Sequence, residues 1–344
     1  MSAEAKTTDR DGLKLGVAGV GSLGFHHARI ARELDGVRME GFFDPDPDRT
    51  EAVRRELAVE SFPTLDALLE AVDAVVVASP TRTHADLALA AIERGVHVFI
   101  EKPIAATLEE ADQIVGAAET SGVRVQVGHV ERFNPALVAA DPVLDGPLFI
   151  ESHRLAPFTE RGTDVAVVLD LMIHDVDLVA SLVAAPIEDI QAIGVPILTE
   201  SVDIANARIS FANGAVANLT ASRVSSEKLR KLRIFQRSGY MSLDLANGRG
   251  EYLRLKRDLP ALQALAEGPA AQSPIAPDLS AIVERIPLTA EPAEPLRREL
   301  ESFRDSILDG RPPVVSARAG RDALATALAI EARIMNHVAD TRSS

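Results

Sequence analysis

Length, composition and charge exclude several classes of protein before any motif is considered. The chain has 344 residues, of which 47% are hydrophobic and 25% charged, so it is long enough for two globular domains. Its net charge of -15 and the lack of a Lys- or Arg-rich stripe argue against a nucleic-acid partner. Because the chain has no cysteine, disulfides, thiolate nucleophiles and Cys-based zinc sites are excluded.

The sequence also carries no sign of export or membrane insertion. No apolar run approaches the roughly 20 residues that a membrane helix needs, and residues 1–11 are polar with mixed charge. We therefore expect no secretory signal, no transit peptide and no membrane association, and we predict a cytoplasmic location.

The first 130 residues are predicted to form a parallel sheet covered by helices. Strand-like runs alternate with helical patterns such as residues 83–94, where a threonine precedes spaced apolar residues and Gly95 follows. The expected strands are residues 13–18, 37–43, 74–77, 97–100 and 124–127.

The pattern changes after Pro135 to that of an α+β domain. A very apolar helix is expected over residues 164–182, and turn signals between later strand-like runs suit hairpins of a largely antiparallel, open sheet. Residues 257–295, rich in proline and alanine, are predicted to be a long surface loop, and two helices with apolar faces close the chain. The expected strands are residues 187–195, 204–211, 215–222, 229–235 and 240–244.

A glycine motif marks the first strand-to-helix turn as a dinucleotide site. The pattern GxGxxG at residues 19–24 directly follows a predicted strand and opens a helix. The first glycine permits the tight turn, the second lets backbone N–H groups approach a pyrophosphate, and the third allows close helix packing. The alternative is a tight turn without a ligand.

An aspartate after the second strand indicates which dinucleotide binds. Asp44 stands 20 residues after Gly24, where a carboxylate accepts hydrogen bonds from the adenine ribose and repels a 2′-phosphate. With Asp46 beside it and no arginine before Arg49, NAD is favoured over NADP. Asp44 could instead be a helix cap.

Two further turns are expected at the same carboxyl edge of the sheet. Residues 79–81 follow one strand, where they contact the nicotinamide half of the cofactor or form a turn capped by Thr83. Lys102 follows the next strand and precedes Pro103, which fixes the local backbone and so aims the amine. A surface lysine is the alternative.

The apolar helix carries a pair of polar residues four positions apart. Asp170 and His174 share one face of such a helix, and burying them is costly unless they pair or line a polar cavity. With Lys102 they supply what alcohol oxidation needs, a base that takes the hydroxyl proton while a hydride leaves. We predict His174 or Lys102 as that base; a structural Asp–His hydrogen bond is the alternative.

At these motifs the chain resembles the glucose-fructose oxidoreductase / inositol dehydrogenase / MocA (Gfo/Idh/MocA) family over nearly its whole length. The matching segments are residues 19–24, 79–85, 95–103 and 170–174. The resemblance implies a Rossmann domain over residues 1–130 and a substrate-binding and oligomerisation domain over residues 131–344. It implies a catalytic group of Lys102, Asp170 and His174. It implies cofactor contacts from Gly19, Gly21, Ser22, Leu23, Gly24, Asp44, Ser79, Pro80, Thr81, His84, Glu101 and Lys102.

A narrower likeness concerns the substrate. Residues 128–135, Arg154, residues 161–164 and residues 170–177 resemble the bacterial UDP-N-acetylglucosamine 3-dehydrogenase branch, which oxidises the sugar 3-hydroxyl before an aminotransferase acts on the route to lipid A. Three arginines among them suit a diphosphate, although each could be a surface salt bridge. The expected substrate contacts are Glu131, Arg132, Phe133, Asn134, Arg154, Arg161 and His174.

Other functions stay open at this point. The same catalytic group suits an inositol, a free aldose or a UDP-sugar uronate, with NAD or NADP. A non-catalytic NAD-binding regulatory protein needs no proton acceptor, and a metal-dependent isomerase or lyase needs clustered ligands that the histidine spacing does not offer, so we expect no metal. We expect a homodimer or homotetramer.

Overall fold

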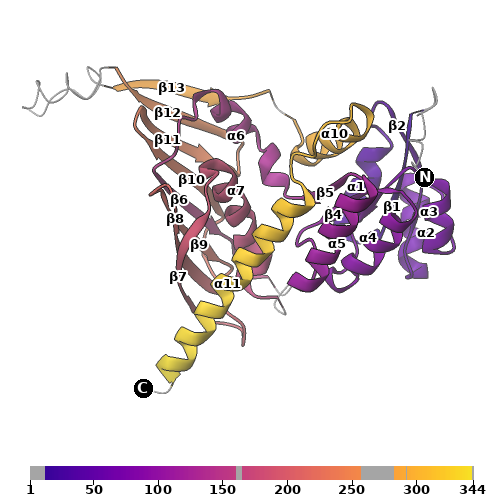
Figure 1. Ribbon diagram of the computed structural model, residues 1–344, viewed down its shortest axis with the longest axis horizontal. Coiled ribbons are helices and arrows are strands. Elements are labelled where there is room, and N and C mark those ends of the chain that lie inside the picture. The colour runs from indigo at the N-terminus through magenta and orange to yellow at the C-terminus, as the bar shows by residue number, and fades with distance from the viewer. Residues whose placement is uncertain (1–11, 160–164, 257–282, 292, 343–344) are drawn as a thin grey trace, which may run out of the picture. The chain divides into compact units, whose positions relative to one another are not determined.

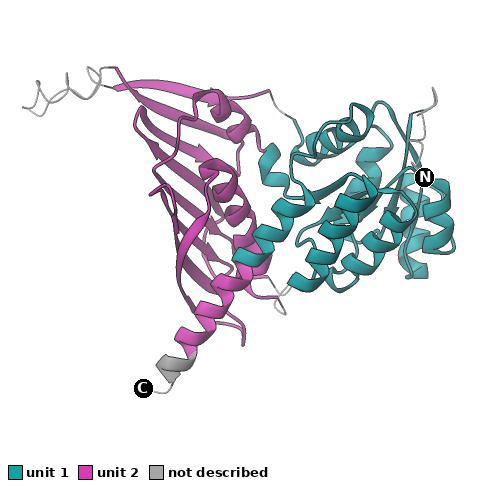
Figure 2. Ribbon diagram, in the orientation of Figure 1, with its two compact units in different colours: residues 1–133, 293–326 teal, residues 134–292, 327–344 magenta. Residues whose placement is uncertain are grey.

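The computed structural model describes residues 12–159, 165–256, 283–291 and 293–342 (Figure 1). The chain divides into two units: residues up to 133 with 293–326 form the first, and residues 134–292 with those from 327 onward form the second (Figure 2). Residues 1–11, where we expect no secretory signal or transit peptide, and Arg161, a predicted substrate contact, lie outside the described residues.

The first unit contains a parallel sheet of five strands in its described part, in the order β2-β1-β3-β4-β5. This confirms the predicted parallel fold, because helices cross between the strands and cover the sheet. The strands are β1 (Leu13–Ala18), β2 (Val37–Phe43), β3 (Ala74–Val77), β4 (His97–Glu101) and β5 (Val125–Gly128). The helices between them are α1 (Ser22–Ala31), α2 (Pro47–Leu57), α3 (Leu65–Ala71), α4 (His84–Glu93) and α5 (Leu108–Ser121).

A helix from the far end of the chain completes the core of this unit. In α10 (Pro295–Leu308), Phe303 packs edge-on against Phe99 of β4, with ring centroids 5.8 Å apart. Both rings are almost fully buried among aliphatic side chains of β1, β2 and α1. Gln126 of β5 also donates to the Glu299 carbonyl oxygen at 3.0 Å, so α10 is held by packing and by a buried hydrogen bond.

The second unit contains a mostly antiparallel sheet of eight strands in its described part, in the order β13-β12-β11-β10-β6-β9-β8-β7. The neighbouring strands are antiparallel except for one parallel pair, β6 with β9. The prediction of a largely antiparallel sheet is therefore confirmed. The strands are β6 (Phe149–Leu155), β7 (Ile187–Val195), β8 (Ile204–Phe211), β9 (Val216–Ser222), β10 (Leu229–Gln236), β11 (Gly239–Asp244), β12 (Arg249–Leu255) and β13 (Val283–Thr289).

Alternation along β8 shows how the sheet buries one face. Ala205, Ala207 and Ile209 are fully buried, whereas Asn206 and Arg208 between them are exposed. In this unit α6 (Pro135–Ala140), α7 (Ile173–Val183) and the end of α11 (Ala317–Arg342) belong with the sheet (Figures 1 and 2). The apolar alternation therefore sets which face the helices cover.

Three strands of this sheet were not expected. β6 and β12 have no counterpart among the predicted strands, and β13 falls within residues 257–295, so the loop prediction is wrong for Val283–Thr289. The reason is Pro287, which is disfavoured in a central strand but tolerated on an edge strand such as β13. Residues 257–282 of that predicted loop lie outside the described part.

The apolar helix of the second unit also differs from a regular one. It begins with a π-helical turn, η4 (Val168–Met172), and continues as α7 to Val183. The Ile173 N–H accordingly bonds to the Val168 carbonyl oxygen five residues back. Because nearly every residue of 165–173 is apolar, the sequence has no periodicity that could separate a π turn from an α turn.

Candidate active site

The glycine loop between β1 and α1 has room only for glycine at two positions. A Cβ on Gly24 would lie 1.9 Å from the Gly19 carbonyl oxygen, and Gly19 itself has φ +89° with Ser79 backbone atoms 2.8 Å from its Cβ position. Gly21 precedes α1 without a side-chain cap. The first turn of α1 therefore offers backbone N–H groups to an anion, which fits a dinucleotide pyrophosphate.

Asp44, at the end of β2, fixes this loop from the other side. Its Oδ2 accepts the Val20 N–H at 2.8 Å, and its Oδ1 accepts the Asp46 N–H at 2.9 Å. A carboxylate has about four acceptor sites, so capacity remains for ribose hydroxyls. Asp46 takes the helix-cap role, because it accepts the N–H groups of Asp48 and Arg49.

A groove of about 580 Å³ opens beside Asp44 between α2 and residues 61–63. This volume lies in the range of about 300–1,000 Å³ that is usual for small-molecule pockets.

The sequence did not indicate Arg49 as part of the site, yet its Nη1 lies only 3.1 Å from the Cβ position of Gly21. Arg49 lies in the first turn of α2, after the Asp46 cap, and this position in the sequence could have indicated it.

The turn after β3 is tied to the turn after β4 by one histidine. The ring nitrogens of His84 lie 2.9 Å from the carbonyl oxygens of Ser79 and Pro103, and the side chain is buried. The Ser79 hydroxyl also bonds to Thr83 at 2.7 Å. His84 therefore supports the two turns that carry Pro80, Thr81 and Lys102.

Glu101 ends β4 and is buried beside the proposed catalytic lysine. Its Oε1 lies 2.7 Å from His27 Nε2, and its Oε2 accepts the Lys102 N–H at 3.2 Å. Burial works to raise the pKa of Glu101, but the His27 hydrogen bond and the charges of His27 and Lys102 hold it below its usual value. Lys102 is part-buried at this edge, and its bond to Pro103 is cis.

In the second unit Asp170 and His174 lie on successive turns. Asp170 sits in the π turn and His174 in the first turn of α7, both partly buried. The next residue, Asp175, anchors the helix to β6 through a buried ion pair with Arg154 (2.7 and 3.2 Å) and a bond from Ser152 (2.9 Å). The Arg154 cation, predicted to contact substrate, is thus bonded to a helix carboxylate.

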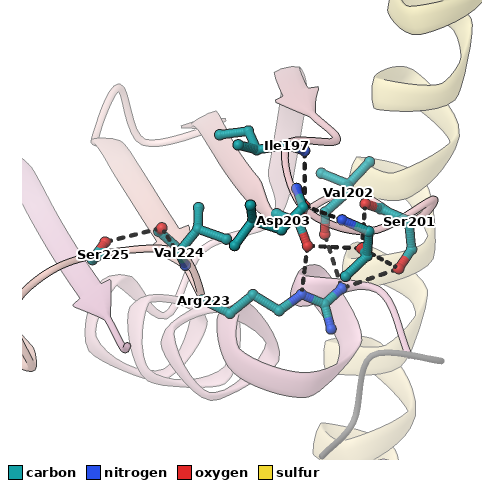
Figure 3. A network of polar contacts seen from close by, with 10 residues as sticks. Ile197, Ser201, Val202, Asp203, Arg223, Val224 and Ser225 are labelled. Atoms are coloured by element: carbon teal, nitrogen blue, oxygen red, sulfur yellow. Dashed lines mark hydrogen bonds and ion pairs between the residues drawn. The ribbon is translucent and has the colours of Figure 1, made fainter. Parts of the chain in front are cut away.

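A second buried carboxylate organises the loop that leads into β8 (Figure 3). Asp203 Oδ2 accepts the N–H groups of residues 197–199 at 2.6–2.9 Å, and its Oδ1 lies 3.2 Å from Arg223 Nε. Burial works to raise the pKa of Asp203, but these backbone bonds outweigh it and lower the pKa to about 2. The Val202 carbonyl oxygen accepts the Val167 N–H at 3.3 Å, so the loop supports the start of the π turn.

The remaining predicted substrate residues lie where the chain leaves β5. Glu131, Arg132 and Phe133 form a short turn, η2 (Val130–Phe133), in which Glu131 is buried. Asn134 caps α6 by accepting the Ala136 N–H, as predicted for the start of that helix, and its amide donates to the Leu245 carbonyl oxygen at 2.8 Å.

No group of three or more His, Asp or Glu side chains in the described part is placed to hold a metal ion. Within the same part of the chain, no helix has the length and apolar character needed to cross a membrane.

Comparisons with known proteins agree with this architecture. Residues 13–129 match the model of an oxidoreductase family with an NAD-binding Rossmann fold, and residues 149–242 match the Gfo/Idh/MocA C-terminal domain. The chain is 36% identical to UDP-N-acetylglucosamine 3-dehydrogenase of Acidithiobacillus ferrooxidans, covering 94% of this chain and 97% of the relative. It is 31% identical to scyllo-inositol 2-dehydrogenase (NAD(+)) of Bacillus subtilis, covering 62% and 68%.

Solved structures give the same result. A structure of the Acidithiobacillus ferrooxidans enzyme superposes with a TM-score of 0.83 at 35% identity, covering 94% of this chain and 97% of that one. Scyllo-inositol dehydrogenase of Lactobacillus casei, solved with NAD(H) and scyllo-inositol, has a TM-score of 0.75 at 21% identity over 95% and 98%, which supports the fold alone. The chain therefore belongs to the Gfo/Idh/MocA family of NAD-binding oxidoreductases.

Proposed function

We propose that the protein is an NAD-dependent dehydrogenase that oxidises the 3-hydroxyl of UDP-N-acetylglucosamine to a ketone. The likeness to the Acidithiobacillus ferrooxidans enzyme along almost the whole of both chains supports this substrate. The observation that carries the reaction type is the position of Lys102, directly after Glu101 at the carboxyl end of β4. The glycine loop and Ser79 follow neighbouring strands β1 and β3 at that same edge.

The residues of the first unit suit the cofactor on structural grounds. The space at Gly19 and Gly24, the uncapped start of α1 and the acceptor Asp44 fit a dinucleotide. When bound, NAD supplies the hydride acceptor. The predicted contacts Ser22, Leu23, Thr81 and His84 remain part of this proposal, with His84 acting through the turns that it holds.

Proton transfer needs a base among the predicted catalytic residues. Oxidation of a secondary alcohol removes a hydride from carbon and a proton from oxygen, so a base must take that proton. Lys102 and His174 are the candidates, and Asp170 is proposed to orient the histidine. Either choice is consistent with a ketone, NADH and one released proton.

Recognition of the diphosphate is proposed for the arginines among the predicted substrate contacts. Arg132 and Arg154 are described, and Arg154 is held rigidly by Asp175. Because Asp175 offsets the charge of the buried Arg154, the assignment of Arg154 to the diphosphate rests on the resemblance alone. Glu131, Phe133 and Asn134 remain proposed substrate contacts. A cytoplasmic location stays a prediction from the sequence, and a homodimer or homotetramer and a following aminotransferase stay predictions from the resemblance.

The test uses purified protein with NAD and a panel of UDP-N-acetylglucosamine, UDP-glucose, glucose and inositol, following NADH. Because ketone formation is reversible, an aminotransferase is added to convert the ketone to an amine and so draw the reaction forward. Reduction of NAD with UDP-N-acetylglucosamine alone supports the proposal. Reduction with inositol alone would return the chain to another branch of the family.

A further inference from the structure

A buried histidine outside the predicted catalytic group touches the segment that carries Lys102. His27 lies on α1, three residues after the last glycine of the loop, and its side chain is 0% exposed. Its Nε2 is 2.7 Å from Glu101 Oε1, and its ring packs edge-on against Phe99 with centroids 5.1 Å apart. The neighbouring His26 is exposed.

The donor in this bond follows from the charge of Glu101. Since its pKa is held below the usual value, Glu101 is a carboxylate near neutral pH and can only accept. His27 Nε2 therefore donates. The other oxygen of the carboxylate accepts the Lys102 N–H at 3.2 Å, so one side chain connects the histidine to the backbone of the lysine.

The space around Glu101 leaves little freedom for another arrangement. A Cβ on Gly128 of β5 would lie 2.9 Å from Glu101 Oε2 and 3.2 Å from its Cα. The carboxylate is thus enclosed by Gly128 on one side and His27 on the other. Removing the donor leaves a buried charge without that partner, which costs more than the bond itself.

We propose that His27 is a positioning residue for Lys102 and acts through the Glu101 carboxylate. The inference rests on the proposed function, in which Lys102 works on the substrate. His27 fixes the Glu101 side chain, and Glu101 fixes the backbone and the local charge at Lys102. The glycine loop and the lysine are thereby held by the same helix, α1, so cofactor binding and amine placement share one support.

The test compares two replacements that separate hydrogen bonding from packing. In His27→Gln the amide N–H can reach the position of Nε2 and donate to Glu101, whereas His27→Phe keeps a ring against Phe99 and donates nothing. We expect kcat to fall roughly 10- to 100-fold in His27→Phe and to stay within about threefold in His27→Gln. The KM for sugar and the Kd for NADH should change little. The same two replacements at His26 are matched controls and should leave kcat unchanged.

If kcat fell more in His27→Gln than in His27→Phe, the proposal would be overturned, because phenylalanine preserves a packing role and glutamine does not. If circular dichroism shows that His27→Phe does not fold, His27→Asn takes its place, since its amide lies at the position of Nδ1 and falls short of Glu101. A His27→Asn enzyme as active as His27→Gln would likewise count against a positioning bond.

A measurement without substrate separates this proposal from the proposed function. Trypsin does not cut before proline, so Lys102 is the one lysine of the tryptic peptide Gly95–Arg124. Its rate of acetylation by acetic anhydride, relative to exposed Lys228, is expected to change at least threefold in the variant without the donor and not in His27→Gln. An unchanged rate overturns the positioning role. A changed rate in an enzyme that oxidises none of the sugars supports the positioning role and refutes the proposed function.

Discussion

Replacement of Asp203 by asparagine is expected to lower the free energy of opening the loop before β8 by about 2.5 kcal/mol. The pKa of Asp203 falls from 3.8 to about 2 on folding, and one pKa unit corresponds to about 1.4 kcal/mol. Because the folded pKa is depressed, this stability is present above about pH 4 and is lost as pH falls through about 2. At neutral pH, amide exchange at residues 197–199 should therefore accelerate roughly 60-fold, as read by mass spectrometry.

The difference in amide exchange between wild type and Asp203→Asn should depend on pH. At pH 3 the difference between wild type and Asp203→Asn should shrink to roughly half, since the carboxylate of the open loop, with its ordinary pKa of 3.8, is then mostly protonated. Glu51→Gln is the control, because its exposed pair with Arg55 is worth at most about 0.5 kcal/mol. Exchange that does not change at neutral pH, or a difference that is constant down to pH 3, would refute the reasoning.

Other predictions concern the cofactor edge. Gly24→Ala should weaken NADH binding at least about tenfold, because its Cβ would lie 1.9 Å from the Gly19 carbonyl oxygen, whereas Gly116→Ala, with nothing within 4 Å, should bind NADH normally in a fluorescence titration. Lys102→Met should lower kcat by about 100-fold or more while the Kd for NADH stays within about threefold; near-full turnover would remove Lys102 from the catalytic group. Asp44→Ala should raise the KM for NAD roughly 10-fold or more and narrow the preference over NADP, read from initial rates with each cofactor.

Much of the first unit could be predicted because its signals are local. The strands β1 to β4 begin where expected, since each is a short apolar run followed by a polar turn. The glycine motif predicted close packing at its third glycine, and the close contact of Gly24 with Gly19 agrees with this.

The features that escaped prediction depend on contacts far along the chain. Phe303 joins the first core although it lies some 200 residues beyond Phe99. Pro287 made the edge strand β13 look like a loop in the sequence. The π turn around Asp170 lies among residues that are nearly all apolar, so it could not be told from an ordinary helix. His27 carries no motif of its own, so only its 2.7 Å contact with Glu101 distinguishes it from its neighbour.

The most direct test of the central claim is NAD reduction by the purified protein with UDP-N-acetylglucosamine, followed by identification of the product. The account predicts NADH and a 3-keto sugar nucleotide in equal amounts, and the loss of both in Lys102→Met. A wild-type protein that binds NADH but forms no ketone from any sugar of the panel would contradict the claim that this chain is a sugar dehydrogenase.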